Sequence, residues 1–403
     1  DYPKDDSANR RWKSIQNAIN DLDDGAMIYV YNGTYRENLL INKTVRLYGE
    51  NNRGVVISND NVVIDVLSNG SLEIHNFTIR DGTIGIRAVN GRGGNVIKDC
   101  NLYSNDVGIL FDSTPFNNII GCDITSTSQD IKLANSDYNY IRNCSIRGAD
   151  SGIYLDRSSW NDIYYCSFRF NDNAVYLYNS DNNTIASCYM EMKQTISSWP
   201  PTPIVGIQMV DSDYNLISLC NIFNATDYAI QMSSSTNNHI ICCNIWENNA
   251  GIYLVGSSYN VIEESCFYNN TMPAITIDRS SRNNSVYCND FITNGWGIKG
   301  EEISQVYDDG ESNIWYKAMA DALFVTATGE GNYWCDYDGR DANNDGVGDT
   351  PYNILGSAES QDIYPLMNPY GWKENLEEYC DVNWGDRVKS IKSQEHFSQK
   401  LKT

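Results

Sequence analysis

The chain has 403 residues, which is too long for a small disulfide-stapled module and long enough for one large core or two ordinary ones. Its 29 Lys and Arg residues stand against 52 Asp and Glu residues, a formal net charge of −23, so neither nucleic acid nor an anionic membrane surface is an expected partner. No stretch approaches 18 consecutive apolar residues, so no direct membrane span is expected.

Cysteines and glycosylation sequons indicate an oxidising, extracellular setting. The chain has 12 cysteines, and its Asn-x-Ser/Thr sequons are candidate glycosylation sites. We therefore expect a secreted protein of the cell surface, and a start at Asp1 without a signal-peptide core suits a mature product. The sequon asparagines are Asn32, Asn42, Asn69, Asn76, Asn143, Asn182, Asn224, Asn269 and Asn283.

The first predicted element is a helix within residues 1–25. Trp12, Ile15, Ile19 and Leu22 recur at helical spacing, which gives this segment one apolar face. Because an open solenoid leaves an apolar, hydrogen-bonding end uncovered, we interpret the helix as an N-terminal cap.

Residues 26–300 carry an internal repeat with a period of about 22 residues. Each unit runs Cys-x-apolar, Gly/Ala-Ile-x-Leu, a Ser-rich turn and Asn-x-Ile-x-x-Cys. Leucine-rich repeats have a similar period, but they need a Leu-rich helical half, whereas this half holds short alternating strands broken by turn residues. We therefore predict an all-β fold, a parallel β-helix whose coils stack about 4.8 Å apart.

The cysteines divide into two predicted groups. Seven share one slot of the repeat and are expected to point inward as small buried thiols, because a rise near 4.8 Å is too wide for an unstrained disulfide. This cysteine ladder comprises Cys100, Cys122, Cys144, Cys166, Cys188, Cys220 and Cys243. The others lie outside the slot, and we expect exposed thiols and disulfides within the chain or between subunits, with Cys335 pairing Cys288 or Cys380 as the intrachain alternative. This second group comprises Cys242, Cys266, Cys288, Cys335 and Cys380.

Two further columns are predicted at one turn of the coil. Stacked asparagine amides can satisfy each other and the backbone at a bend. The asparagine column comprises Asn117, Asn139, Asn161, Asn183, Asn215, Asn238, Asn260 and Asn283. The residues before it include Phe116, Tyr138, Trp160, Tyr214 and Tyr259. We expect an exposed aromatic strip that stacks on sugars, contacts another protein or shields the turn.

The repeat fades near residue 300, and residues 301–370 are predicted to close the C-terminal end. This segment contains a pattern of oxygen ligands with a Gly at the bend that is typical of a calcium loop, although Tyr352 stands where such loops carry a bidentate Glu. The predicted calcium ligands are Asp341, Asn343, Asp345, the carbonyl of Val347, and Asp349. Calcium is the expected cofactor, and no organic cofactor is expected.

Residues 371–403 form a predicted tail that is a cap, an arm to a neighbour, or partly disordered.

Two regions carry a resemblance to a known family. Residues 33–39 (GTYRENL) and 41–50 (INKTVRLYGE) resemble the opening of NosD-like right-handed parallel β-helices, which belong to the carbohydrate-binding and sugar-hydrolase repeat group. Residues 331–337, 341–352 and 364–367 are similar to the C-terminal closure of secreted archaeal members. The resemblance implies a right-handed parallel β-helix over about residues 11–370. The group includes polysaccharide enzymes, copper-site maturation factors and envelope proteins, among them cysteine-rich surface layers and sheaths, so the resemblance implies the fold and leaves these three functions as alternatives.

Copper is a candidate ligand through this resemblance. His75, His239 and His396 lie far apart and share no row of the repeat. Met190 and Met192 form a soft-ligand pair, but methionines at such positions are more typical of hydrophobic packing. We therefore do not expect a specific copper site.

A carbohydrate-cleaving enzyme needs carboxylates that converge on one face over neighbouring coils. Asp112, Asp156 and Asp278 follow a strand at similar phase, and Arg157 and Arg279 follow two of them. In the coils that we assign to either side of Asp156 and Arg157, the equivalent positions hold only Asn and Ser. These positions are 135, 136, 179 and 180. No catalytic residue is predicted.

The sequence favours an extracellular structural protein that assembles with itself into a cell-envelope layer or tubular sheath, stabilised in part by disulfides between subunits. Surface glycans and other envelope proteins are further expected partners. The alternative is a β-helix that binds or cleaves polysaccharide, and a remoter one is a copper-site accessory protein.

Overall fold

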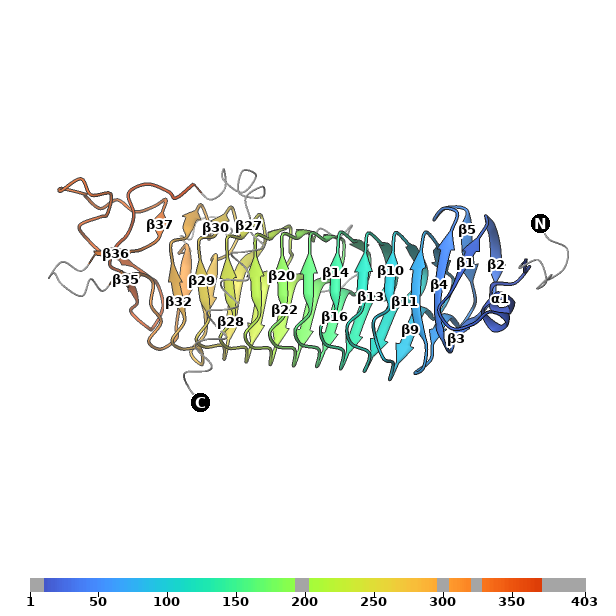
Figure 1. The fold of residues 1–403 in the computed structure, drawn as a ribbon. Coiled ribbons are helices and arrows are strands. Elements are labelled where there is room, and N and C mark those ends of the chain that lie inside the picture. Colours follow the sequence, from blue (N-terminus) through green and yellow to red (C-terminus); the bar gives the residue numbers. More distant parts are fainter. Residues whose placement is uncertain (1–10, 193–202, 296–303, 320–327, 372–403) are drawn as a thin grey trace.

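The computed structural model describes residues 11–192, 203–295, 304–319 and 328–371. Within these residues the chain winds into a rod of stacked coils, with a short helix at one end and an irregular closure at the other (Figure 1). The strands form three parallel sheets that run along the rod, because residues one coil apart pair in register. The predicted all-β parallel β-helix is confirmed.

Strands of the three sheets alternate along the chain. The first sheet contains β1 (Ala26–Val30), β4 (Thr44–Gly49), β7 (Ser71–His75), β10 (Val96–Lys98), β12 (Asn118–Ile120), β14 (Tyr140–Arg142), β17 (Asp162–Tyr164), β20 (Thr184–Ala186), β23 (Leu216–Ser218), β26 (His239–Ile241), β29 (Val261–Glu263) and β32 (Ser285–Tyr287). The second contains β2 (Gly33–Arg36), β5 (Val55–Ser58), β8 (Thr78–Arg80), the first parts of β11 (Asn101–Asp112) and β13 (Asp123–Ala134), β15 (Ser145–Arg147), β18 (Ser167–Arg169), β21 (Tyr189–Glu191), β24 (Asn221–Phe223), β27 (Asn244–Trp246), β30 (Cys266–Tyr268), β33 (Asp290–Ile292) and β37 (Tyr333–Trp334). The third contains β3 (Leu39–Ile41), β6 (Val62–Val66), β9 (Ile84–Val89), the last parts of β11 and β13, β16 (Ser151–Asp156), β19 (Asn173–Tyr178), β22 (Val205–Val210), β25 (Tyr228–Ser233), β28 (Ala250–Val255), β31 (Ile275–Ile277) and β34 (Val306–Asp308).

Helix α1 (Ile15–Asp21) covers the N-terminal end of the rod, inside the segment where a capping helix was predicted. Ser14 is its N-cap, and the carboxylate of Glu37 in the first coil accepts backbone N–H groups from the first turn. Ile15 and Ile19 are buried against the coil. The helix therefore supplies both the apolar cover and the polar anchor that an open solenoid end needs.

The asparagine column is a continuous hydrogen-bonded ladder. The Oδ1 atom of Asn161 accepts both the backbone N–H and the Nδ2 group of Asn139, each at 2.8 Å. The ladder reaches Asn284 through Asn260, whose two N–H groups donate to the Oδ1 atom of Asn284. The prediction of Asn283 was wrong by one residue, because this coil is longer and Asn283 takes the positive-φ place before the ladder.

The seven cysteines of the cysteine ladder lie in the interior, where they are buried free thiols. Each sulfur also lies within weak hydrogen-bond distance of a carbonyl two residues earlier, as in Cys166 Sγ to Tyr164 O at 3.4 Å. Ser265 and Asn289 occupy the same slot and donate to the carbonyls of Glu263 and Tyr287 at 2.9 Å. From Cys100 onward the slot therefore favours a side chain that can donate to this carbonyl, which the interpretation as apolar filler missed, whereas Phe77 fills the slot one coil earlier. Burial raises the pKa of Cys100 in this ladder to about 12.

The coil continues beyond residue 300, further than the sequence predicted, because β34 pairs with β31 and β37 pairs with β33. Trp315 and Trp334 close the apolar interior, and their indole N–H groups donate to the buried carboxylates of Asp308 and Asp362 at 3.0 and 2.9 Å. The closure also holds two antiparallel pairs, β35 (Lys317–Met319) with β36 (Thr328–Glu330) and β38 (Tyr352–Asn353) with β39 (Gln361–Asp362). The predicted tail beyond Gly371 lies outside the described residues.

Candidate functional site

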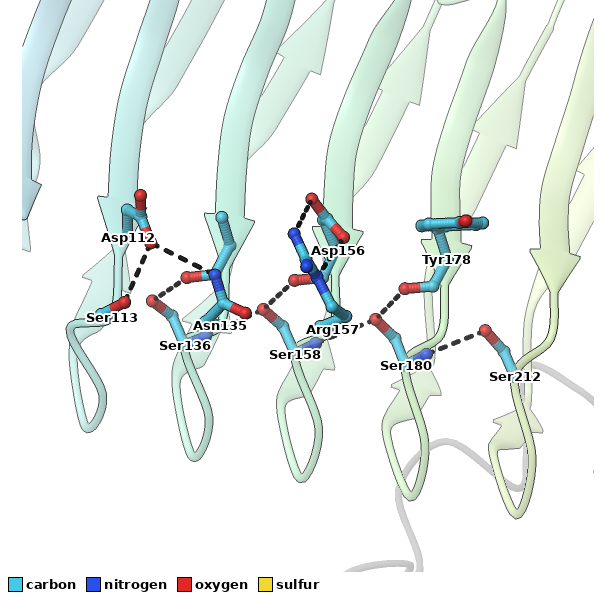
Figure 2. A network of polar contacts seen from close by, with 11 residues as sticks. Asp112, Ser113, Asn135, Ser136, Asp156, Arg157, Ser158, Tyr178, Ser180 and Ser212 are labelled. Carbon is cyan, nitrogen blue, oxygen red and sulfur yellow. Dashed lines mark hydrogen bonds and ion pairs between the residues drawn. The ribbon is translucent and has the colours of Figure 1, made fainter.

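The turn from the third sheet to the first fixes the edge of the candidate site. Buried hydroxyls form a second ladder there: the backbone N–H of Ser136 donates to Ser158 Oγ, and that of Ser158 donates to Ser180 Oγ, both at 3.0 Å (Figure 2). Because this ladder and the asparagine ladder hold the turn on its inner side, the residues around them project outward in register from coil to coil.

A column of polar and aromatic side chains covers the outer side of the third sheet next to this turn. We call it the tyrosine face; its members pair in register across six successive coils and are all partly exposed. It comprises Lys132, Tyr154, Tyr176, Gln208, Gln231 and Tyr253. The rings of Tyr154 and Tyr176 stack with centroids 5.1 Å apart, and Lys132 Nζ lies 5.3 Å from the Tyr154 centroid. The amides of Gln208 and Gln231 meet at 3.3 Å.

Charged groups border the tyrosine face where the strands end (Figure 2). Arg157 Nε lies 3.0 Å from Asp156 Oδ1, and Asp112 accepts a hydrogen bond from Asn135 Nδ2 at 3.3 Å. Partial burial raises the pKa of Tyr154, and the nearby carboxylate of Asp156 raises it further, so this phenol stays protonated at neutral pH. The border therefore offers a cation, a carboxylate and hydroxyl donors beside the stacked rings.

One detail of the predicted carboxylate row needs correction. Asp156 pairs with Ala134 and Tyr178, so the alignment that placed Asn and Ser on either side of it was one residue out of register. Asp278 follows its strand at the same phase, as predicted, and accepts hydrogen bonds from Ser280 and Ser281 of its own turn. Asp156 is held by Arg157, so the row contains individually bonded carboxylates.

The predicted aromatic strip lies at the outside of the same turn. Phe116 and Tyr138 are 57% and 51% exposed, and their rings stack at 5.2 Å, with Trp160 continuing the stack 6.2 Å from Tyr138. Tyr214 and Tyr259 occupy the same place in later coils and are exposed. Each of the five residues has a positive φ, which points the side chain away from the interior.

The cysteines outside the ladder are less exposed than predicted. Cys242, Cys266 and Cys288 are buried, so the expectation that they are surface thiols was wrong. Cys335 is a partly buried free thiol whose sulfur accepts a hydrogen bond from the backbone N–H of Thr293 at 3.2 Å, and it forms no disulfide with Cys288. Cys380 lies outside the described residues.

The predicted calcium ligands share one exposed loop. Asp341 accepts the backbone N–H of Gly346 at 2.9 Å, Asp349 accepts that of Ala342 at 2.8 Å, and Asn343 donates to Asp345 at 2.8 Å. No cluster of three or more His, Cys, Asp or Glu side chains fit for a metal occurs in the described ranges of the chain. The oxygens of this loop are turned toward its own backbone.

The sequon asparagines remain accessible. All nine are exposed or partly exposed, as a glycan attachment site requires. Six of them have positive φ values and lie at turns between sheets: Asn76, Asn143, Asn182, Asn224, Asn269 and Asn283. Whether they carry glycans stays a prediction.

The tyrosine face is the feature that reasoning from sequence missed. Its members fill the variable position of Gly/Ala-Ile-x-Leu, as in Tyr154 after Ile153 and Tyr176 after Val175. Alternation along a strand places this position outward, between two inward residues, so the signal was present in the repeat template itself.

Comparisons with known proteins agree with the fold. The model of the family described as periplasmic copper-binding protein (NosD) matches residues 173–339, and that of the right handed beta helix region matches residues 62–199. No curated protein matches the chain.

Among solved structures, the Dettilon tailspike protein gp208 has a TM-score of 0.50 at 14% identity, over 74% of this chain and 64% of that one. The Azotobacter vinelandii mannuronan C-5 epimerase AlgE4 A-module also has 0.50, at 12% identity, over 72% of this chain and 90% of that one. Geobacillus virus E2 ORF18 has 0.47 at 17% identity, over 70% and 56%. The chain spans less than two thirds of the length of the tailspike and of ORF18. These likenesses show the fold alone.

The described residues do not fit a shared copper site. His75 Nε2 lies 3.0 Å from Glu73 Oε1, and His239 Nε2 lies 2.8 Å from Glu263 Oε1. The two histidines stand on β7 and β26, seven strand spacings or about 34 Å apart along the first sheet. Met190 and Met192 are buried in the interior, and His396 lies outside the described residues.

The coils and the family matches together identify the fold. No helix in the described part of the chain is long and apolar enough to cross a membrane. The two family models overlap at residues 173–199, and the sheets stack in parallel over the residues that both models match. The chain is a right-handed parallel β-helix protein that is similar to the NosD family over residues 173–339.

Proposed function

We propose that this protein is an extracytoplasmic rod that binds an extended polysaccharide along the tyrosine face. The observation that carries the proposal is the unbroken, in-register column of partly exposed Lys, Tyr and Gln side chains over six coils. Aromatic rings offer apolar contact to the C–H face of a sugar, while amides and phenols bond its hydroxyls. The description of the matched family as periplasmic supports a location outside the cytoplasm.

The spacing of the column suits a polymer that runs along the rod. Successive coils present equivalent groups about 4.8 Å apart, close to the length of one sugar residue in an extended chain. The net charge of −23 and the carboxylates of Asp112 and Asp156 at the border favour a neutral glycan over a polyanion.

Binding to an array of neutral and acidic polysaccharides, followed by titration of any ligand found, tests the proposal. We expect Tyr176→Ala to weaken binding roughly fivefold to tenfold, because it removes one ring from the stacked pair. Tyr140→Ala is the matched control, since Tyr140 is a partly exposed tyrosine on the first sheet, and it should bind like the parent. Equal loss in both variants, or no binding to any glycan, contradicts the proposal. New reducing ends or unsaturated products would instead identify a cleaving enzyme.

Self-assembly into an envelope layer or sheath is a second candidate function. The exposed stack of Phe116, Tyr138 and Trp160 supports it, because an apolar strip of this kind is suited to contact with another copy. Electron microscopy and sedimentation at rising concentration test it. Assembly that persists in Tyr138→Ser would refute this edge as the interface. The burial of Cys242, Cys266 and Cys288 favours assembly without disulfides from these residues.

We also propose that the loop over residues 341–349 binds calcium. The order of oxygen donors at Asp341, Asn343, Asp345 and Asp349 on one exposed loop supports it, and binding requires these oxygens to turn from the loop's own N–H groups toward the ion. Calcium should raise the unfolding midpoint of the full chain above that in a chelator, and Asp345→Asn should abolish the difference. An identical midpoint with and without calcium in the parent contradicts the proposal.

A further inference from the structure

Asp130 is a buried carboxylate in a row of the third sheet that holds Gly or Ala in the coils around it. It lies on β13, and the residues in register with it on β11 and β16 are Gly108 and Gly152. Asp130 itself is fully buried. The row continues with Ala174, Gly206, Ala229, Gly251 and Ala274. The coil therefore closes at this position without a carboxylate, and the charge of Asp130 needs another explanation.

Within the described residues, no positively charged side chain forms an ion pair with Asp130. Its carboxylate accepts hydrogen bonds from the backbone N–H of Ser126 at 2.6 Å and from Asn171 Nδ2 at 3.2 Å. Burial nevertheless dominates and raises the pKa of Asp130 well above its usual range. An ionised carboxylate in this place therefore requires a positive partner.

Two oxygens beside this carboxylate have no hydrogen-bond partner within the described part of the chain. They are Ser126 Oγ and Asn171 Oδ1, in residues that are 4% and 0% exposed. The Ser126 hydroxyl is close enough to lower the pKa of Asp130, but it lies outside hydrogen-bond geometry. The amide of Asn171 is oriented by its Nδ2, since the reverse orientation would set its oxygen against the carboxylate. Buried oxygens of this kind indicate a partner that the protein chain does not supply.

Later coils close the same turn with amides alone. Asn248, Asn270 and Asn294 stand two residues after a strand of the second sheet, as Asn171 does. Their Oδ1 atoms accept the backbone N–H of the preceding coil at 2.9, 3.1 and 3.2 Å. The coil before Asn171 has Ala149 at this position, and its side chain offers no polar atom. The amide ladder is therefore interrupted where Asp130 and Asn171 meet.

We propose that Asp130 binds a monovalent cation of the size of sodium inside the rod, with Asn171 Oδ1 and Ser126 Oγ as neutral ligands. Carboxylate, amide and hydroxyl oxygens all offer lone pairs, and hard cations prefer such oxygen ligands. One carboxylate balances one positive charge, whereas a divalent ion would leave an excess charge in the interior. The ion joins the coils of Asp130 and Asn171 at the place where the amide ladder is interrupted.

Hydrogen exchange at single amides of the full chain tests the proposal. Exchange at the amide of Ser126, which donates to Asp130, is compared in sodium chloride and in tetramethylammonium chloride, whose cation is too large for a packed interior. Equal ionic strength keeps the screening of the net charge of −23 the same, and a calcium chelator in both buffers keeps the loop over residues 341–349 free of calcium. We expect exchange at Ser126 to be about fivefold slower or more in sodium. The amide of Ser235, which donates to Ser257 in a distant coil, should change by less than about twofold.

Asp130→Ala is the decisive variant, because alanine occupies the same row at Ala174 and the coil should still close. In D130A, exchange at Ser126 should be the same in the two salts. Asp106→Asn is the matched control, since it removes an exposed carboxylate at the same turn of the preceding coil, and it should keep the sodium effect. Equal rates in the two salts in the parent chain, or a sodium effect that survives in D130A, contradict the proposal.

A second measurement decides if D130A does not fold. Crystals of the parent chain grown with thallium(I) in place of sodium should give an anomalous difference peak beside the carboxylate of Asp130 and Asn171 Oδ1. A map without a peak at this place overturns the proposal. Density for a water molecule there without anomalous signal assigns the two oxygens to a hydrated, protonated Asp130, which also refutes it.

Discussion

At the scale of single residues, the fold depends on turn positions that most side chains avoid. Phe116, Tyr138 and Trp160 have φ values of 61°, 59° and 61° at the same turn of successive coils. A positive φ in a residue other than glycine costs of order 1 kcal/mol and persists only where its surroundings fix it. Here the ladders on the inner side of each turn supply that constraint, because buried amides and hydroxyls bond both the backbone and each other.

A break in the asparagine ladder tests this view. Asn161→Ala removes the Oδ1 atom that accepts two N–H groups of Asn139, and it leaves a buried backbone donor without a partner. We expect a loss of about 2–4 kcal/mol in the free energy of unfolding and faster hydrogen exchange at the amide of Asn139. Asn118→Ala, on the outer side of β12 two coils away, should cost little. Similar stability in the two variants would show that the ladder does not hold the turn.

At the scale of elements, the closure replaces repeated ladders by single buried carboxylates. Asp362 accepts hydrogen bonds from the backbone N–H groups of Asn332 and Tyr364 and from the indole of Trp334, at 2.7, 3.0 and 2.9 Å. Burial nevertheless dominates and raises the pKa of Asp362 from 3.8 to about 6. One titrating group therefore joins three parts of the closure.

The raised pKa of Asp362 predicts a pH dependence of the closure. A folded pKa above the unfolded one means that the folded state binds the proton more tightly. The stabilisation of the folded state by this proton is therefore complete below pH 4 and is lost as the pH rises through 6. The difference is about 3 kcal/mol at most. Denaturant unfolding followed by tryptophan fluorescence should give a more stable closure at pH 5 than at pH 7.5. Asp362→Asn should lower stability at both values and remove the step between them, whereas a step that persists in this variant must come from another group.

At the scale of the whole molecule, the rod is a stack in which each coil contacts mainly its neighbours. Such an architecture tolerates the removal of whole units, since the coils on either side present the same surfaces to each other. The backbone N–H of Ser145 donates to the carbonyl of Cys122, and that of Ser167 donates to Cys144 in the same way. Removal of one unit therefore leaves the bonding pattern unchanged.

Deletion of residues 145–166 tests this modularity. We expect a folded rod that is shorter by about 4.8 Å, measured by small-angle scattering, with an unchanged circular dichroism spectrum per residue. Deletion of residues 145–155 alone is the control, because it shifts every later column out of register and should prevent folding of the downstream coils. A folded product from the half-unit deletion would mean that the columns do not set the register.

The repeat allowed much of the fold to be predicted, because a fixed spacing of inward residues states directly which side chains stack. Cys144, Cys166 and Cys188 lie 22 residues apart and occupy one interior file. The prediction failed where a coil changes length, as at Asn283 and Asn284, since a single added residue exchanges a turn position for a ladder position. It also missed the tyrosine face, because Tyr154 and Tyr176 fill a variable position of the template.

The sequence by itself determined the coil, its capping helix at Ile15–Asp21, the cysteine ladder and the asparagine ladder. Each of these depends on residues at a constant separation along the chain. Only the tertiary structure decided which of the outward-facing side chains are exposed to solvent. Tyr165 and Cys242 share a place in the repeat and a backbone conformation, yet one is exposed and the other buried. The physical reason is that the interior is built by neighbouring coils, whereas the exposure of an outward side chain depends on whether a segment distant in sequence packs over it.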